Sequence, residues 1–189
     1  MSRLSPLNLD DLDADQHAVL EAIQRGPRGN RHGRIGLVGP FGVWVRAPKV
    51  GHAVQAFGGA VRFETALPER VKEVAICTVG AHHRAKFEFA AHRSLAIAAG
   101  VSEQVVEAIR CGTAPSFDDD RERLAHAVTR SLLETHGIDD GLYAQAMALF
   151  GEVGLIELVT IVGYYCLVSF TLNAFEIPLD TNMTDPFPD

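Results

Sequence analysis

The sequence predicts an all-α fold of about seven helices. Along most of the chain, apolar residues recur near the 3.6-residue period of a helix and do not alternate as they do in strands. Clusters of glycine and proline separate these periodic segments and fit the connections between helices. The chain has 189 residues, of which 47% are hydrophobic and 22% are charged. These values are those of one globular domain, and they exclude a collagen, a low-complexity filament and a disulfide-stapled miniprotein.

The N-terminal part is expected to hold one amphipathic helix followed by a long loop. Residues 11–23 place apolar side chains among polar ones behind leading acids, and the helix should end before Gly26. Residues 26–42 (GPRGNRHGRIGLVGPFG) contain too many glycines and prolines for regular structure, so we expect a loop at a pocket rim or a helix crossing. A short helix is then predicted over 48–62.

Three helices are expected in the middle of the chain. Apolar residues at helical spacing mark 69–79, and a further helix follows His83 and is closed by Gly100 in the left-handed conformation. Ser102 is expected to cap the next short helix, which carries an acid in its first turn.

The C-terminal part predicts a helix over 116–135, another from Asp139 or Asp140 to Phe150, and an apolar helix over 154–175. The last approaches the length of about 20 residues that a membrane span needs. Polar residues such as Glu157 interrupt it, however, and no basic residue flanks it. We therefore predict no membrane span. A helix that is apolar nearly all round is normally buried in a bundle centre or a subunit interface, so a homo-oligomer is expected.

Charge is distributed unevenly around a formal net charge of −7. Residues 23–63 contain no acid, whereas no Lys or Arg follows Arg130. The basic stretch lacks interleaved aromatic residues and a groove-reading helix, and the whole chain is acidic, so nucleic acid is not an expected partner. A small carboxylated ligand, or an acidic surface on a neighbouring subunit, fits the basic stretch better.

The cysteines and the N-terminus predict a cytoplasmic protein. The three cysteines, Cys77, Cys111 and Cys166, are widely spaced and form neither a disulfide framework nor a Cys-x-x-Cys pair. The first residues, MSRLSPLNLDDLDADQ, reach several acids before any apolar run of the kind found in signal peptides. Export is therefore not expected.

The candidate chemistry lies on the helix after His83. Glu88 and His92 are four residues apart, so their side chains share one face of that helix. A carboxylate that binds one imidazole nitrogen fixes the tautomer of the ring and leaves the other nitrogen free to move a proton on a substrate. The alternatives are a solvent-exposed ion pair, or a metal held together with His82 and His83. Because the spacing is not that of a His-Glu-x-x-His zinc site, we predict no metal.

At these residues the sequence resembles the carboxymuconolactone decarboxylase-like proteins, which include the alkylhydroperoxidase D group. The resemblance runs from about residue 39 to 179 and is most specific over LPERVKEVAICTVGAHHRAKFEFAAHRSLAIAAGVS. It implies an alkylhydroperoxidase D-like helical bundle that assembles as a dimer, trimer or hexamer. The expected organisation is an N-terminal helix and Gly/Arg-rich loop over 1–38, the family's helical domain over 39–180, and a tail over 181–189.

The resemblance also separates two branches of the family. In the peroxidase branch a Cys-x-x-Cys pair precedes the histidine; alignment on Glu73 and His92 places Ala85 and Glu88 at those positions, so a dithiol peroxidase is not expected. In the decarboxylase branch a glutamate and an aromatic residue precede the histidine, as Glu88 and Phe89 do here, although tryptophan is usual in place of Phe89.

The decarboxylase branch implies a cofactor-independent lyase acting on a small carboxylated lactone or related acid. His92 would donate the proton, with Glu88 as its partner. Glu73 could instead pair with a buried arginine such as Arg70, or with a backbone amide. The side chains expected to bind the substrate are Arg84, Lys86, His83, Glu73, Tyr164 and Arg31 or Arg34.

Two other classes of function remain open at this level. One is an isomerase or carbon–carbon lyase that uses the same pair on another small acid or ketone, which a larger and more hydrophobic pocket would favour. The other is a non-catalytic ligand-binding oligomer, in which Glu88 and His92 would face solvent or form an ion pair with no cavity beside them.

Overall fold

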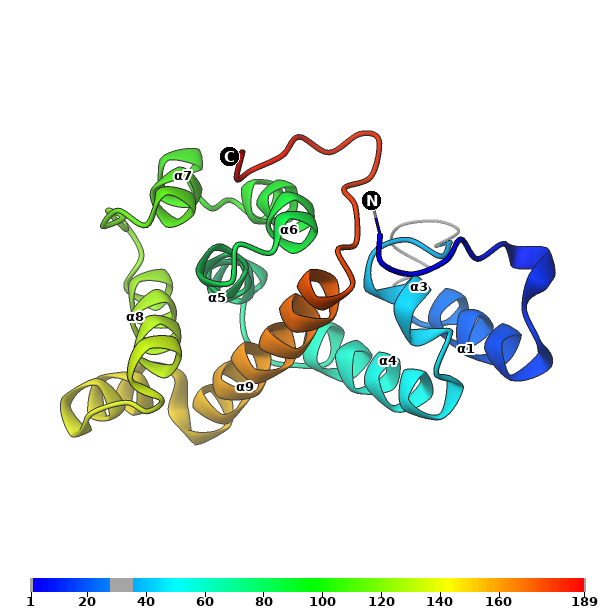
Figure 1. Cartoon of the computed structure of the whole chain (residues 1–189). Helices are drawn as coiled ribbons and strands as arrows, with labels where there is room; N and C mark the ends of the chain where they lie inside the picture. Colours follow the sequence, from blue (N-terminus) through cyan, green and yellow to red (C-terminus); the bar gives the residue numbers. More distant parts are fainter. Residues whose placement is uncertain (1, 28–35, 189) are drawn as a thin grey trace.

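The computed structural model describes residues 2–27 and 36–188, and over these residues the fold is all-α, as predicted (Figure 1). A 3-10 turn at Leu9–Asp11 precedes the helices. The α-helices are α1 (Ala14–Arg25), α3 (Pro40–Trp44), α4 (Pro48–Phe63), α5 (Glu69–His82), α6 (Lys86–Ala98), α7 (Glu103–Cys111), α8 (Asp120–Thr135) and α9 (Asp140–Ala174).

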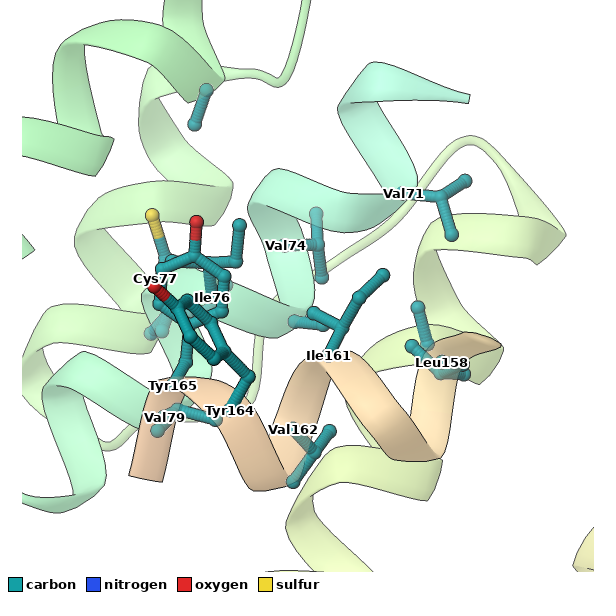
Figure 2. Packing of buried hydrophobic residues seen from close by; sticks show 14 of the residues in the cluster. Val71, Val74, Ile76, Cys77, Val79, Leu158, Ile161, Val162, Tyr164 and Tyr165 are labelled. Carbon is teal, nitrogen blue, oxygen red and sulfur yellow. The ribbon is translucent and has the colours of Figure 1, made fainter. Parts of the chain in front are cut away.

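Helix α5 is the centre of the fold. It packs against α6, α7, α8 and α9, and every residue from Val71 to Gly80 is buried. The apolar residues that repeat at helical spacing in α5 therefore mark only part of its buried surface. Figure 2 shows apolar side chains of α5 and α9 meeting in this core, among them Val74 and Ile161. Helix α1 lies on the opposite side of the molecule from α8 (Figure 1) and packs against α4. Its buried residues Val19, Leu20 and Ile23 belong to a second, smaller hydrophobic cluster.

The tight connection between α5 and α6 positions the candidate site. Arg84 adopts a left-handed backbone conformation with φ of 48°, which reverses the chain after His83. A Cβ atom on Gly80 would lie 3.4 Å from the backbone of Phe89, so the absence of a side chain at Gly80 lets the two helices approach closely. The first two turns of α6, which carry Glu88 and His92, thereby lie against α5.

Helix α9 is bent at Gly151, whose backbone (φ 68°, ψ 177°) is not helical. This bend corresponds to the boundary that the sequence predicts between two helices. The second part is long and apolar enough to cross a membrane, but it is a core helix that contributes Leu158, Ile161 and Tyr165 to the interior. Ile156 and Phe170 are each 59% exposed on its surface. These exposed apolar side chains support the expected oligomer, which stays a prediction.

Several local predictions differ from the structure. Helix α3 forms at Pro40, inside the segment expected to be a loop, because proline suits the first turn of a helix. Ser102 stands at the N-cap of α7 but makes no capping hydrogen bond with its side chain. Helix α8 begins only at Asp120, because the side chain of Asp119 accepts the capping hydrogen bond from Arg121.

The close crossing of α3 and α4 yields the first prediction. A Cβ atom on Gly51 would lie 2.3 Å from the backbone oxygen of Trp44, so Gly51→Ala must push the two helices apart. We expect this variant to lower the free energy of unfolding by about 1–3 kcal/mol. Chemical denaturation followed by circular dichroism measures the change.

The matched control is Gly163→Ala on α9, where nothing lies within 4 Å of the added Cβ atom. That variant should be neutral or more stable by up to about 1 kcal/mol, because alanine favours the helix. Equal effects of the two substitutions would show that the crossing of α3 and α4 is not tightly packed.

Candidate active site

Four helices bring ionisable and aromatic side chains to one place. Arg62 comes from the end of α4, Glu73 from α5, Glu88 and His92 from α6, and Tyr165 from α9. Their helices are adjacent because α5 packs against both α6 and α9, and α4 packs against α9. Residues that are far apart in the sequence therefore form one cluster in the interior.

His92 lies between two carboxylates. Its Nδ1 atom is 2.7 Å from Oε2 of Glu73, and its Nε2 atom is 3.1 Å from Oε1 of Glu88. Glu73 is completely buried and Glu88 is 4% exposed. The ring of Tyr165 meets the imidazole edge to face, with centroids 5.1 Å apart. Both nitrogens of His92 thus have an acceptor, and the ring is fixed on three sides.

These carboxylates set the protonation state of His92. Burial alone would lower the pKa of the imidazole, but the negative charges and hydrogen bonds of Glu73 and Glu88 outweigh it and raise the pKa from 6.5 to about 9. His92 is therefore an imidazolium at neutral pH and donates one hydrogen bond to each carboxylate.

Arg62 forms an ion pair with the second carboxylate oxygen of Glu73. Its Nη2 atom donates to Oε1 of Glu73, and its Nη1 atom is 2.5 Å from Oε1 of Glu69. Lys72 completes the cluster, since its Nζ atom donates to the backbone oxygen of Arg62 and lies 3.1 Å from Oε2 of Glu69. The cluster therefore has three cations, Arg62, Lys72 and His92, which balance the three carboxylates. This neutrality makes the burial of so many charges tolerable.

The partner of Glu73 differs from the one suggested by the sequence. Arg70, the suggested arginine, turns toward α8 and donates to Glu122 instead. On α5 the two positions are three residues apart, but Arg70 is accessible to solvent whereas Glu73 faces α4 and α6. Arg62, 11 residues earlier in the chain, takes the place of Arg70.

A cavity of about 460 Å³ opens beside the cluster. Most of its wall is apolar and includes Phe41, Trp44 and Phe87. The polar side chains of the wall are those of Arg62, Glu88, His92, Ser94, Tyr164 and Tyr165. Glu73 does not line the cavity, so it acts on His92 from behind. The site thus presents a protonated imidazole to an apolar space.

Tyr165 adds a second proton donor to the wall. Burial and the nearby carboxylate of Glu88 raise its pKa well above the ordinary value of 10. The phenol therefore keeps its proton at all physiological pH values and can donate a hydrogen bond to an oxygen atom in the cavity.

Four of the expected substrate ligands, Glu73, Lys86, Arg84 and His83, do not line the cavity. The Nζ atom of Lys86 is 2.6 Å from Oδ2 of Asp185, and the guanidinium of Arg84 lies 5.3 Å from the ring centre of Phe187. His83 packs edge to face with Phe170 and with His82. Tyr164 does line the cavity, as expected, while Arg31 and Arg34 fall outside the residues that the structure describes.

Sequence reasoning overlooked Arg62, Trp44 and Met183, all of which line the cavity. A signal for Arg62 existed, since it is a lone cation near the end of an apolar helix. Nothing in the sequence connected Met183 with a site. Over residues 2–27 and 36–188, no group of three His, Cys, Asp or Glu side chains is arranged to hold a metal ion.

Part of the sequence matches the model of a known protein family. Residues 48–131, from the start of α4 into α8, match the model of the Carboxymuconolactone decarboxylase family. This segment contains Arg62, Glu73, Glu88 and His92. No sequence among curated proteins matches significantly.

Solved structures share the fold. An uncharacterized peroxidase-related protein from Ralstonia eutropha JMP134, an alkylhydroperoxidase AhpD core, has a TM-score of 0.78 at 14% identity over 95% of this chain and 93% of its own. The debrominase Bmp8 without ligand gives 0.72 at 15% identity, covering 93% of this chain and 91% of its own. A Bmp8 complex with 2,3,4-tribromopyrrole gives 0.74 at 16% identity, covering 96% and 95%. At these identities the likeness shows the alkylhydroperoxidase D-like fold.

The protonation of His92 gives a pH prediction. We expect the imidazole of His92 to titrate with a pKa of about 9, and Glu73→Gln to lower that pKa, because the variant removes the carboxylate that contributes most to raising it. NMR of the ring nitrogens against pH measures both values. An unchanged pKa in Glu73→Gln would contradict this assignment.

The raised pKa of His92 also makes the stability of the fold depend on pH. A folded-state pKa above the unfolded value of 6.5 means that the ion pairs of His92 stabilise the fold fully below pH 6.5. This contribution is lost as the pH rises through about 9. The melting temperature should therefore fall more between pH 6 and pH 10 in wild type than in Glu73→Gln, as measured by thermal unfolding.

Proposed function

We propose that this protein is a cofactor-independent lyase, because residues 48–131 match the model of the Carboxymuconolactone decarboxylase family and the chain has an alkylhydroperoxidase D-like fold. It decarboxylates a small organic acid, such as a carboxylated lactone, whose conjugated carbonyl group accepts the electrons. The observation that carries this proposal is a protonated His92, held between two carboxylates at the wall of an apolar cavity.

The cavity favours the bond-breaking step. A carboxylate loses much of its hydration when it enters an apolar space, whereas carbon dioxide is neutral and needs none. The carbon–carbon bond breaks, and its electron pair passes into the conjugated carbonyl group as an enolate. The phenol of Tyr165 can donate to the enolate oxygen, and the positive charge of His92 lies beside it.

The second step returns a proton to carbon. The Nδ1 proton of His92 is directed at Glu73, which does not line the cavity. The Nε2 proton lies between His92 and Glu88, and both of these side chains do line it. This proton is the one delivered to the substrate carbon, after which His92 regains a proton from water. The negative charges of Glu73 and Glu88, which raise the pKa of His92, favour its return to the protonated form.

The cavity wall also favours a second candidate, an isomerase acting on a small ketone. Among the lining residues described, Arg62 is the one Lys or Arg, and Glu69 and Glu73 already pair with its guanidinium. The wall therefore suits a ligand without a second carboxylate. A variant of the debrominase Bmp8, whose fold is similar to this one, forms a complex with 2,3,4-tribromopyrrole, a small ring. An isomerase would use the same proton on the enolate of a ketone.

The cysteines argue against a dithiol peroxidase. Within the described parts of the chain, no cysteine lines the cavity. Cys77 is fully buried, and burial together with the nearby carboxylates raises the pKa of its thiol well above 9. Such a thiol stays protonated and is a poor nucleophile.

The catalytic roles predict the effects of two substitutions. His92→Ala should lower kcat by about 10²–10⁴-fold, because it removes the general acid, while the helical circular dichroism spectrum is retained. Glu88→Gln should lower kcat less, because the amide keeps a hydrogen bond and loses only the charge. The measurement is mass spectrometry of γ-carboxymuconolactone and related acids after incubation in D₂O, with detection of released carbon dioxide and deuterium in the product.

The matched control is His82→Ala, which alters an exposed histidine on α5 and should leave turnover unchanged. Deuterium exchange into ketones without release of carbon dioxide from any acid would favour the isomerase. If His92→Ala turns over any of these compounds as fast as wild type, the proposed role of His92 is wrong.

A further inference from the structure

The C-terminal segment Thr181–Pro188, here called the C-terminal strap, runs back over α6 (Figure 1). Its composition, rich in proline and small polar residues, predicts a tail. In the structure, however, Pro186 and Phe187 are buried, and Phe187 is only 3% exposed. The strap is therefore a packed part of the fold.

The strap is anchored to the α5–α6 connection and to the first turn of α6. The ring centroids of Phe187 and Phe89 are 5.2 Å apart, and the guanidinium of Arg84 lies over the ring of Phe187, 5.3 Å from its centre. Asp185 pairs with Lys86 at 2.6 Å. Thus Arg84 and Lys86, two of the cations that the sequence suggests as substrate ligands, hold the strap.

A third anchor comes from α7. Nη1 of Arg110 donates to the backbone oxygen of Pro186 at 2.7 Å. Within the strap, the backbone nitrogen of Phe187 donates to Oδ1 of Asp185 at 2.8 Å. The residues on the C-terminal side of Met183 are thus fixed by aromatic, ionic and backbone contacts.

Met183 is placed by these anchors between two cavities. It lines the main cavity of about 460 Å³ beside His92. It also lines a second cavity of about 490 Å³ between the strap and α6, whose wall includes Arg93, Asn182 and Thr184. Ala90 and Ser94 are the other residues common to both walls. Both of these residues are small, so Met183 has the longest of the three side chains that the two walls share.

We infer that Met183, held by the C-terminal strap, determines the length of ligand that the main cavity admits. Its thioether side chain separates the main cavity from the second one, so that a ligand must fit within the main cavity and cannot extend into the space beneath the strap. Shortening this side chain joins the two cavities. This inference rests on the proposed function in one respect, that the cavity beside His92 is where the substrate binds.

Ligand binding tests this partition without any turnover. Trp44 is the sole tryptophan of the chain and lines the main cavity, so its fluorescence reports occupation of that cavity. The probes are benzoate and biphenyl-4-carboxylate, which share a carboxylate and differ in length. The proteins are wild type, Met183→Ala, the volume-conserving Met183→Leu, and Thr184→Ala as the control beside it on the strap.

Met183→Ala should bind biphenyl-4-carboxylate at least ~10-fold more tightly than wild type, with less than about 3-fold change for benzoate. Met183→Leu and Thr184→Ala should behave as wild type does. Equal binding of the long acid to wild type and Met183→Ala, a parallel shift for both acids, or no binding to any of the four proteins would overturn the inference. If this pattern of binding is found but no acid loses carbon dioxide, the partition stands and the proposed reaction falls.

Discussion

Two carboxylates buried in an apolar interior are the constraint on which the rest of this structure depends. Glu73 and Glu88 are almost inaccessible to water, and each would be costly to ionise alone. His92 bridges them, and Arg62 neutralises the second oxygen of Glu73. Removing one member would leave an uncompensated charge, a change that typically costs about 3–5 kcal/mol. Helices α4, α5 and α6 must therefore meet at this point for the fold to be stable.

The same constraint determines the protonation of the candidate site. The two buried carboxylates raise the pKa of His92 to about 9, so the imidazole is protonated at neutral pH although it lies in the interior. The cavity beside it is apolar and has a phenol, that of Tyr165, which stays protonated. Charge balance thus secures the fold and prepares a proton for transfer. Met183 of the C-terminal strap lines the cavity in which that transfer would occur.

The parts of the account that depend on local spacing could be predicted from the sequence. The helical period located the core helices, and the four-residue spacing placed Glu88 and His92 in contact. Arg62 could not be assigned, because its contact with Glu73 depends on how α4 crosses α5. Nor could the sequence show that Arg84 and Lys86 contact Phe187 and Asp185, because these partners lie about 100 residues away in the chain. The composition of residues 181–189, which contain both partners, indicates only a tail.

The central claim is that His92 carries protons on both ring nitrogens at neutral pH and shares one of them with Glu88. Neutron diffraction from a deuterium-exchanged crystal at pH 7 tests it directly, because it locates the hydrogens that X-rays rarely show. The account predicts deuterium on both Nδ1 and Nε2, with Glu73 and Glu88 unprotonated. A neutral His92 with deuterium on one nitrogen, together with a deuterated carboxyl on Glu88 or Glu73, would contradict it.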